Sequence, residues 1–114
     1  MTLEQLVPSL ELCQKAQRLG WKRETYFYYA LWYGEWVLID RNSMVFARTT
    51  SLVPAPILQE VFEELSQIGD VEITYSQRIG AWYITVGQLE SSRVALVEAA
   101  LELWCELEES KVKQ

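Results

Sequence analysis

Apolar residues recur at helical spacing in three stretches of the chain. Proline suits the first turn of a helix, serine suits the cap before it, and glycine suits the position just after the last turn. These residues mark the ends of the three stretches. We therefore predict three helices: from about Pro8 or Ser9 to Leu19 before Gly20, from Ile57 to Leu65 before Gly69, and from Ser91 or Ser92 to about Glu109.

Aromatic and β-branched residues between these helices follow patterns that are typical of strands. The segment 25–33 reads TYFYYALWY and is followed by Gly34-Glu35 and the apolar run 36–39. Because Gly34 can adopt the positive φ of a type II′ turn, we expect Gly34-Glu35 to be the two-residue loop of a hairpin. The remaining predictions are a candidate third strand at 44–47, a polar connection at 48–53, and a second hairpin of 71–76 and 81–86.

The predicted order is helix, two or three strands, helix, two strands, helix. A chain of 114 residues has the length of one domain, so residues 1–114 are expected to form one. We expect an α+β fold in which one antiparallel sheet of four to five strands is covered on one face by three helices.

The composition of the chain excludes several common kinds of catalytic and metal-binding site. The chain has no histidine, which removes imidazole acid–base catalysis and the common catalytic relays. It also lacks a glycine-rich phosphate loop and a cluster of metal-ligand residues. Cys13 and Cys105 fall on apolar helical positions, where buried small hydrophobic residues are the ordinary explanation. We expect no enzyme, no cofactor and no metal site.

The number and distribution of charged residues disfavour two classes of partner, double-stranded nucleic acid and the membrane. Sixteen acidic residues against ten basic ones leave a formal charge of -6, which disfavours binding to double-stranded nucleic acid. The longest uncharged stretches, 49–59 and 79–89, are far shorter than the roughly 20 apolar residues that span a bilayer. The first residues lack the pattern of a signal peptide. These features predict a cytoplasmic protein with no membrane partner and with reduced cysteines.

Aromatic side chains lie on both faces of the first predicted hairpin. Because side chains alternate along a strand, the rings divide between the two faces. Helices can cover only one face, so the other needs a partner, a ligand or a second copy of the chain. Packing of the rings in the core is the alternative, and we favour an interaction surface. Tyr26, Tyr28 and Trp32 are predicted on one face, and Phe27, Tyr29, Leu31 and Tyr33 on the other.

A basic and aromatic cluster surrounds the end of the first helix. Lys22 and Arg23 lie beside Trp21 and Tyr26, close to Lys15 and Arg18. Such a group can bind a phosphate or a nucleotide by charge and stacking. The alternative is that the cations complement the C-terminal end of the helix dipole. Arg48 can join this site only if the fold brings it close.

The last predicted helix carries Glu98, Glu102 and Glu106 at a spacing of four residues. This stripe is either a docking patch for a basic surface or a solvated face. The same helix has a broad apolar arc, which indicates deep burial or a shared interface in a homodimer.

Several short motifs are spread over most of the chain. Ser9-Leu10-Glu11-Leu12 leads to Gly20 and then to Thr25-Tyr26-Phe27-Tyr28, and Pro54-Ala55-Pro56, Trp82-Tyr83 and Leu101-Glu102-Leu103-Trp104 follow. Together they resemble a group of short uncharacterised proteins of tailed bacteriophages and prophages. Cys13 departs from that group, in which alanine is more common. The resemblance implies a phage or prophage setting inside a bacterium and brings no reaction, cofactor or catalytic residue.

We therefore expect a non-enzymatic accessory protein that acts by stoichiometric binding of a host protein, for example to antagonise a host defence system. One alternative is an oligomer that sequesters a nucleotide signal, with rings stacking on the base and cations meeting the phosphate. The other is a structural or assembly factor of the virion. The residues that we expect to bind are Trp21, Lys22, Arg23, Tyr26, Tyr28, Trp32, Arg48, Glu98, Glu102 and Glu106.

Overall fold

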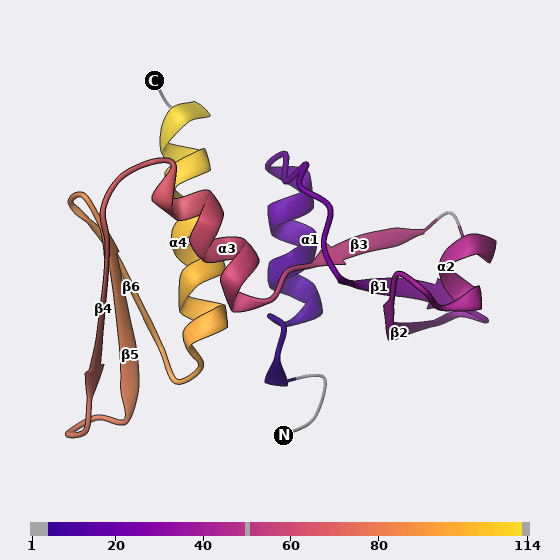
Figure 1. Cartoon of the computed structure of the whole chain (residues 1–114), viewed down its shortest axis with the longest axis horizontal. Helices are drawn as coiled ribbons and strands as arrows, with labels where there is room; N and C mark the ends of the chain where they lie inside the picture. The colour runs from indigo at the N-terminus through magenta and orange to yellow at the C-terminus, as the bar shows by residue number, and fades with distance from the viewer. Residues whose placement is uncertain (1–4, 50, 113–114) are drawn as a thin grey trace.

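The first half of the chain forms one helix, a three-stranded sheet and a short second helix. The computed structural model describes residues 5–49 and 51–112. The first helix begins within two residues of the predicted start at Pro8 or Ser9, and Ser9 caps it, since its side chain accepts a hydrogen bond from the Leu12 N–H at 3.4 Å. The elements are α1 (Leu10–Arg18), β1 (Phe27–Trp32), β2 (Glu35–Asp40), α2 (Met44–Arg48) and β3 (Leu52–Ala55) (Figure 1).

Two of the elements predicted in this half are wrong. The candidate strand at 44–47 lies in α2, because the Ser43 side chain accepts a hydrogen bond from the Val45 N–H at 3.2 Å and starts a helical turn. The predicted polar connection ends in β3, which pairs with β1 despite Pro54. Proline fits there because β3 is an edge strand in the order β2-β1-β3. This antiparallel sheet is called sheet A below.

The second half contains a helix, another antiparallel sheet and the long C-terminal helix. The second hairpin is confirmed, and β5 pairs with a further strand that the sequence pattern did not predict. Gly87, at φ 63°, allows the tight turn that joins these two strands, so Ser91 and Ser92 lie in a strand and not at a helix start. The elements are α3 (Leu58–Ser66), β4 (Val71–Ser76), β5 (Ala81–Val86), β6 (Leu89–Arg93) and α4 (Leu96–Val112). The sheet, of order β4-β5-β6, is called sheet B.

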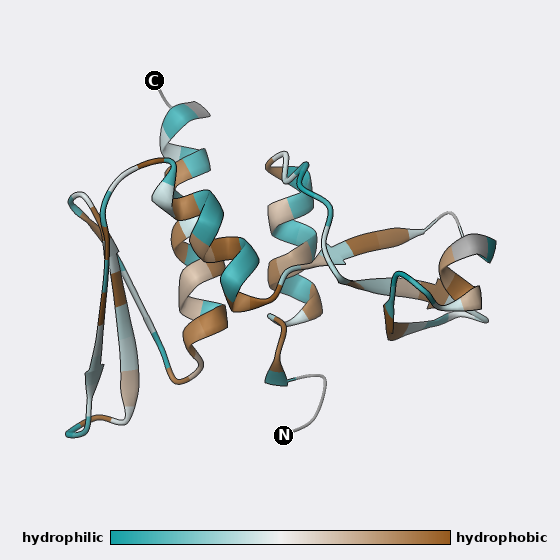
Figure 2. Cartoon of the chain, viewed as in Figure 1, coloured by the Kyte–Doolittle hydropathy of each residue, from teal (hydrophilic) through white to brown (hydrophobic). Residues whose placement is uncertain are grey.

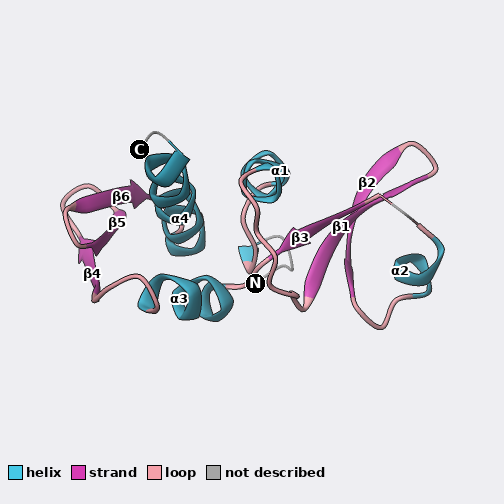
Figure 3. Ribbon diagram, turned by 90° about the horizontal axis from the view of Figure 1, so that it is seen from above, coloured by secondary structure: helices cyan, strands magenta, loops and turns pink. Residues whose placement is uncertain are grey.

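The α+β class is confirmed, but the single sheet is wrong. Sheets A and B lie on opposite sides of α1, α3 and α4 (Figures 1 and 3). α1 packs on β3 and α4, while α4 packs on α3, β5 and β6. The helices therefore form a middle layer with a sheet on either side. Among the described residues, no helix is long and apolar enough to cross a membrane.

The C-terminal helix supplies the centre of the core. Its residues Ala99, Leu101 and Leu103 are fully buried, and they join residues of both sheets in one hydrophobic cluster. Hydrophobic residues colour β3 and parts of α3 and α4 in Figure 2. The broad apolar arc of α4 is thus buried within its own chain. Of the two alternatives for this arc, deep burial is the one observed, so α4 gives the expected dimer no support.

Replacing Leu101 with alanine tests the central role of α4. We expect Leu101→Ala to lower the free energy of unfolding by about 2 to 5 kcal/mol, because it leaves a cavity among fully buried neighbours. Val94→Ala, at a side chain that is 79% exposed, should change it by less than about 0.5 kcal/mol. Urea denaturation measures both values, and equal effects would contradict the assignment of the core.

Candidate functional site

The hairpin of β1 and β2 ends in a turn that differs from the predicted one. Trp32 pairs with Glu35, so the two loop residues are Tyr33 and Gly34. Both have positive φ, 51° at Tyr33 and 80° at Gly34. Two successive residues of positive φ are the pattern of a type I′ turn, which favours asparagine or aspartate followed by glycine. The predicted Gly34-Glu35 loop of type II′ is therefore wrong by one residue.

Tyr33 combines an unfavourable backbone with an exposed ring. A residue with a Cβ in the left-handed region costs roughly 1 to 2 kcal/mol, and asparagine and glycine tolerate it best. The Tyr33 side chain is 90% exposed, and its ring meets the edge of Trp32 with centroids 4.9 Å apart. Because the ring is so exposed, its burial offsets little of the free-energy cost of the backbone conformation. An unfavourable conformation held at an exposed aromatic residue is a feature that clusters at binding sites.

Two further apolar side chains lie next to the turn. Leu31 and Trp36 are opposite each other on paired strands, so they share one face of sheet A. They are 36% and 38% exposed. Tyr33 lies in the turn that joins these strands, and its ring contacts Trp32, whose side chain is on the opposite face. We call the three exposed apolar residues at this end of sheet A the tip surface: Leu31, Tyr33 and Trp36.

α1 covers one face of sheet A near the middle of the molecule, and α2 covers part of the other face. On the face of Leu31, Phe27 is buried, and the Tyr29 hydroxyl donates to the Pro8 carbonyl oxygen at 2.9 Å, just before α1. On the opposite face, Tyr28 is buried against Phe46 of α2, with ring centroids 5.0 Å apart. The tip surface lies beyond these contacts.

The predicted aromatic residues thus have different environments. Tyr28 is buried and Trp32 is half-buried, so neither offers a free ring face of its own. Tyr26 is 43% exposed, but it lies at the start of β1, at the other end of the strand from the tip surface. Its N–H donates to Glu60 at 3.1 Å. The structure does not gather these three residues into one surface.

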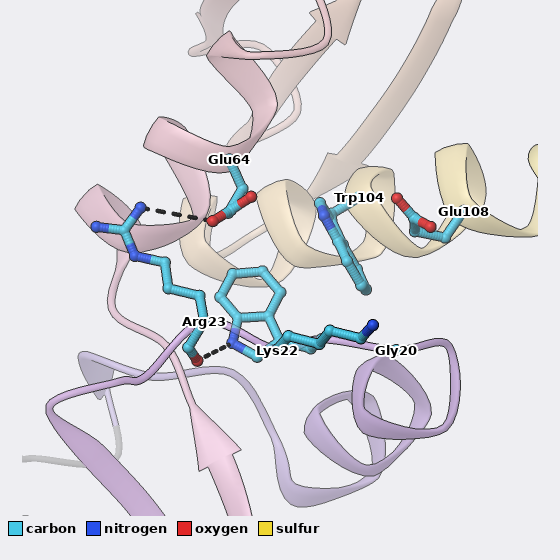
Figure 4. A pocket seen from close by; sticks show the side chains of 7 residues that line it. Gly20, Lys22, Arg23, Glu64, Trp104 and Glu108 are labelled. Atoms are coloured by element: carbon cyan, nitrogen blue, oxygen red, sulfur yellow. Dashed lines mark hydrogen bonds and ion pairs between the residues drawn. The ribbon is translucent and has the colours of Figure 1, made fainter.

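The basic cluster lines a pocket of about 520 Å³ beside the end of α1. Trp21 is buried there, and its ring meets Trp104 of α4 edge to face at 5.0 Å. Its indole N–H donates to the Arg23 carbonyl oxygen at 2.9 Å. Lys22 is exposed on the rim (Figure 4). The two indoles are therefore already packed on each other.

Carboxylates offset the cations of this pocket. The Arg23 guanidinium is paired with Glu63 and lies 3.7 Å from Glu64, and Figure 4 shows Arg23 and Glu64 turned toward each other. This pairing lowers the pKa of Glu63 and raises that of Arg23, chiefly through the hydrogen bond between them. Glu64 and Glu108 both line the pocket. Glu108 is itself paired with Lys111 at 2.9 Å. The carboxylates near Arg23 weaken the attraction of this pocket for a phosphate.

Arg48 does not join this pocket. It is exposed at the C-terminal end of α2. The next residue, Thr49, donates from its hydroxyl to the Leu31 carbonyl oxygen at 3.0 Å. Arg48 therefore belongs to the neighbourhood of the tip surface, on the far side of sheet A from the end of α1 (Figure 1).

The acidic stripe of α4 is occupied by contacts within the chain. Glu98 accepts a hydrogen bond from the Ser9 N–H at 2.6 Å and so helps to cap α1. Glu102 is paired with Arg93 of β6. Glu106 is half-buried, and burial followed by the nearby charge of Glu102 raises its pKa. These side chains hold the helix and its neighbours together and do not form an open docking patch.

The two cysteine thiols are poor nucleophiles. Cys13 and Cys105 are fully buried, as predicted, and burial is the largest cause that raises the pKa of each to about 12. A thiol with such a pKa is almost entirely protonated at neutral pH and is a poor nucleophile. The described ranges, 5–49 and 51–112, contain no group of three metal-ligating side chains.

Sequence reasoning missed the residues of the tip surface as a binding site. It placed Leu31 and Tyr33 on one sheet face but could not tell how far α1 reaches along that face. One signal was available: glycine in the second position of a two-residue loop favours a type I′ turn, which puts the bulky Tyr33 in the first position.

The backbone cost at Tyr33 can be isolated with two variants that remove the same ring. We expect Tyr33→Asn to be more stable than Tyr33→Ala by about 1 kcal/mol, because asparagine tolerates positive φ and alanine does not. Urea denaturation of both variants gives the difference. Equal stability would show that Tyr33 is not held in the left-handed region.

The raised pKa of Glu106 predicts a pH-dependent effect. A carboxyl that holds its proton more tightly in the folded chain supports stability at low pH and loses that contribution as pH rises through its pKa. Glu106→Gln should therefore raise the free energy of unfolding at pH 7 by about 0.3 to 0.5 kcal/mol, the size of a like-charge pair on a helix. The gain should vanish near pH 3. A gain that persists there, or that exposed Glu90→Gln reproduces at pH 7, would contradict this account.

Comparison with protein-family models, with curated proteins and with solved structures finds no match. Inference about function therefore depends on the geometry described above. Among the features of residues 5–49 and 51–112, that geometry includes a surface with exposed apolar side chains and an unfavourable backbone at the tip of sheet A. It also includes a polar pocket in which Arg23 is ion-paired and the two indoles pack on each other.

Proposed function

We propose that this protein is not an enzyme and acts by stoichiometric binding of another protein through the tip surface. The single observation that carries this proposal is Tyr33, whose side chain is 90% exposed while its backbone has φ 51°. Stability alone favours asparagine or glycine at this position. A large ring there is explained if it contributes to binding.

The chemistry of the tip surface suits a protein partner. Tyrosine and tryptophan are enriched among the residues that contribute most to protein interfaces, and they lose little conformational entropy when they bind. Leu31 and Trp36 extend the apolar area beside Tyr33. The exposed Glu35, which precedes Trp36 in β2, gives this end of the hairpin a polar side chain. We expect an apolar recess on the partner, bordered by polar groups.

The nucleotide alternative has weaker support. The rings near Lys22 are packed on each other, and Glu64 and Glu108 line the pocket together with the cations. A nucleotide would have to separate Trp21 from Trp104 and bring its phosphate close to two carboxylates. We therefore place the protein partner first and sequestration of a nucleotide second.

The resemblance to phage and prophage proteins suggests the setting of this binding. In that setting the partner is a protein of the bacterial host, and a stoichiometric antagonist of a host defence system fits a small protein without catalytic groups. Assembly into the virion is the remaining alternative. The experiment below distinguishes the three.

The test is capture of a partner from the bacterial host with tagged protein, followed by measurement of affinity and stoichiometry with the purified partner. We expect one partner molecule per chain and a loss of affinity of at least about tenfold in Tyr33→Ser, which removes a central aromatic contact. Tyr75→Ser is the matched control, because Tyr75 is 47% exposed on the other sheet. The control should bind like the unmodified protein.

Three outcomes would overturn the proposal. Equal loss in both variants would show that the tip surface is not the binding site. A cyclic nucleotide that raises the melting temperature while no host protein binds would favour sequestration. Association with phage particles and with no host protein would favour a virion role.

A further inference from the structure

We propose that two copies of this chain pair edge to edge through β2, antiparallel, with a two-fold axis beside Leu38. This inference goes beyond the proposed function, because it requires no other protein. It replaces the expectation of a dimer through the C-terminal helix, whose apolar residues are buried within the chain.

β2 is an edge strand of sheet A whose centre carries no charge and no proline. Natural edge strands carry proline, charges or a covering element that prevents pairing with another chain. β3 contains Pro54 and packs against α1, β4 contains Glu72, and β6 contains Glu90 and packs against α4. The centre of β2 is Trp36-Val37-Leu38-Ile39, without a charge or a proline, and Figure 3 shows β2 on the side of sheet A away from α1.

The hydrogen-bond pattern shows which backbone groups of β2 are free to pair. The Arg41 N–H donates to the Tyr26 carbonyl oxygen at 3.1 Å, and the Leu31 N–H donates to the Ser51 oxygen toward β3 at 3.1 Å. Even-numbered residues of β1 therefore bond to β2. By the observed register, odd-numbered residues of β2 face β1, and Trp36 and Leu38 direct their N–H and C=O groups to the open edge.

Charge selects one register among those that bring these groups together. When Leu38 lies opposite Leu38 of the second copy, Glu35 lies opposite Arg41, and Val37 lies opposite Ile39. Trp36 then lies opposite Asp40, whose carboxylate already accepts a hydrogen bond from the Asn42 N–H at 2.8 Å. The pairing thus combines two symmetric ion pairs with apolar cross-strand contacts. A shift of two residues in one direction would place Glu35 opposite Ile39, and in the other direction Val37 opposite Arg41.

The side chains of β2 are available for such pairing. Glu35 is exposed, and the Arg41 side chain is 47% exposed, with only a loose contact of 3.5 Å to Glu24. Val37 and Ile39 are only half-buried in the single chain. The arrangement would make one six-stranded sheet from two copies of sheet A. Both tip surfaces would lie on the same face, and each turn would approach Met44 of the other copy, which is 69% exposed.

Sedimentation of the purified full chain from about 1 µM to about 300 µM tests this pairing. An edge contact of six residues is small, so we expect a weak, reversible dimer. Glu35→Lys and Arg41→Glu should each raise the dissociation constant about tenfold, since each substitution makes two ion pairs repulsive. The double variant restores opposite charges and should return the constant to within about threefold of the original.

Glu90→Lys on β6 is the matched control and should leave the dimer unchanged, while melting curves verify that each variant is folded. A protein that remains monomeric would overturn the inference. So would a dimer whose dissociation constant is the same in the unmodified protein and in the Glu35 and Arg41 variants. A monomer whose partner complex is lost in both single variants would assign β2 to pairing with another protein. Because Tyr33 is unchanged in this series, failure here leaves the proposed function untouched, and the Tyr33→Ser test can fail while the dimer persists.

Discussion

The limited reach of the helical layer determines which surfaces of this protein are exposed. α1, α3 and α4 lie between two sheets, and the fully buried residues of α4 connect the two sides in one core. α1 covers sheet A where Phe27 and Tyr29 pack, but it does not extend to the end of the hairpin. The rings that follow along β1 and β2 are therefore left in water, together with the open edge of β2.

Much of this architecture follows from local sequence patterns. The three longer helices have apolar residues at helical spacing, and Ser9 is the observed cap of α1. Both hairpins have aromatic or alternating strands. The misses have physical causes: α2 is too short to show a period, and Ser91 gives β6 no apolar signal. The division into two sheets depends on long-range packing of the helices, which no local pattern contains.

The sequence likewise predicted part of the candidate site and not the rest. An excess of aromatic residues in the strands was visible, and so was the cluster around Trp21. The burial of each ring could not be predicted, because it depends on where α1 and α2 lie on sheet A. Tyr28 is covered by Phe46, whereas Tyr33 is uncovered. The charged candidates were found, but Arg23, Glu98 and Glu102 have partners on other elements that only the fold brings close.

The account depends on one contrast, between rings at the end of sheet A that meet solvent and rings between the helices that do not. Photochemically induced dynamic nuclear polarisation detects tyrosine and tryptophan rings that a dye can reach, residue by residue. Strong signals from Tyr33 and Trp36, with none from Trp21 and Trp104, are predicted from their exposures. A silent Tyr33 in the isolated chain, at concentrations where it is monomeric, would contradict the account.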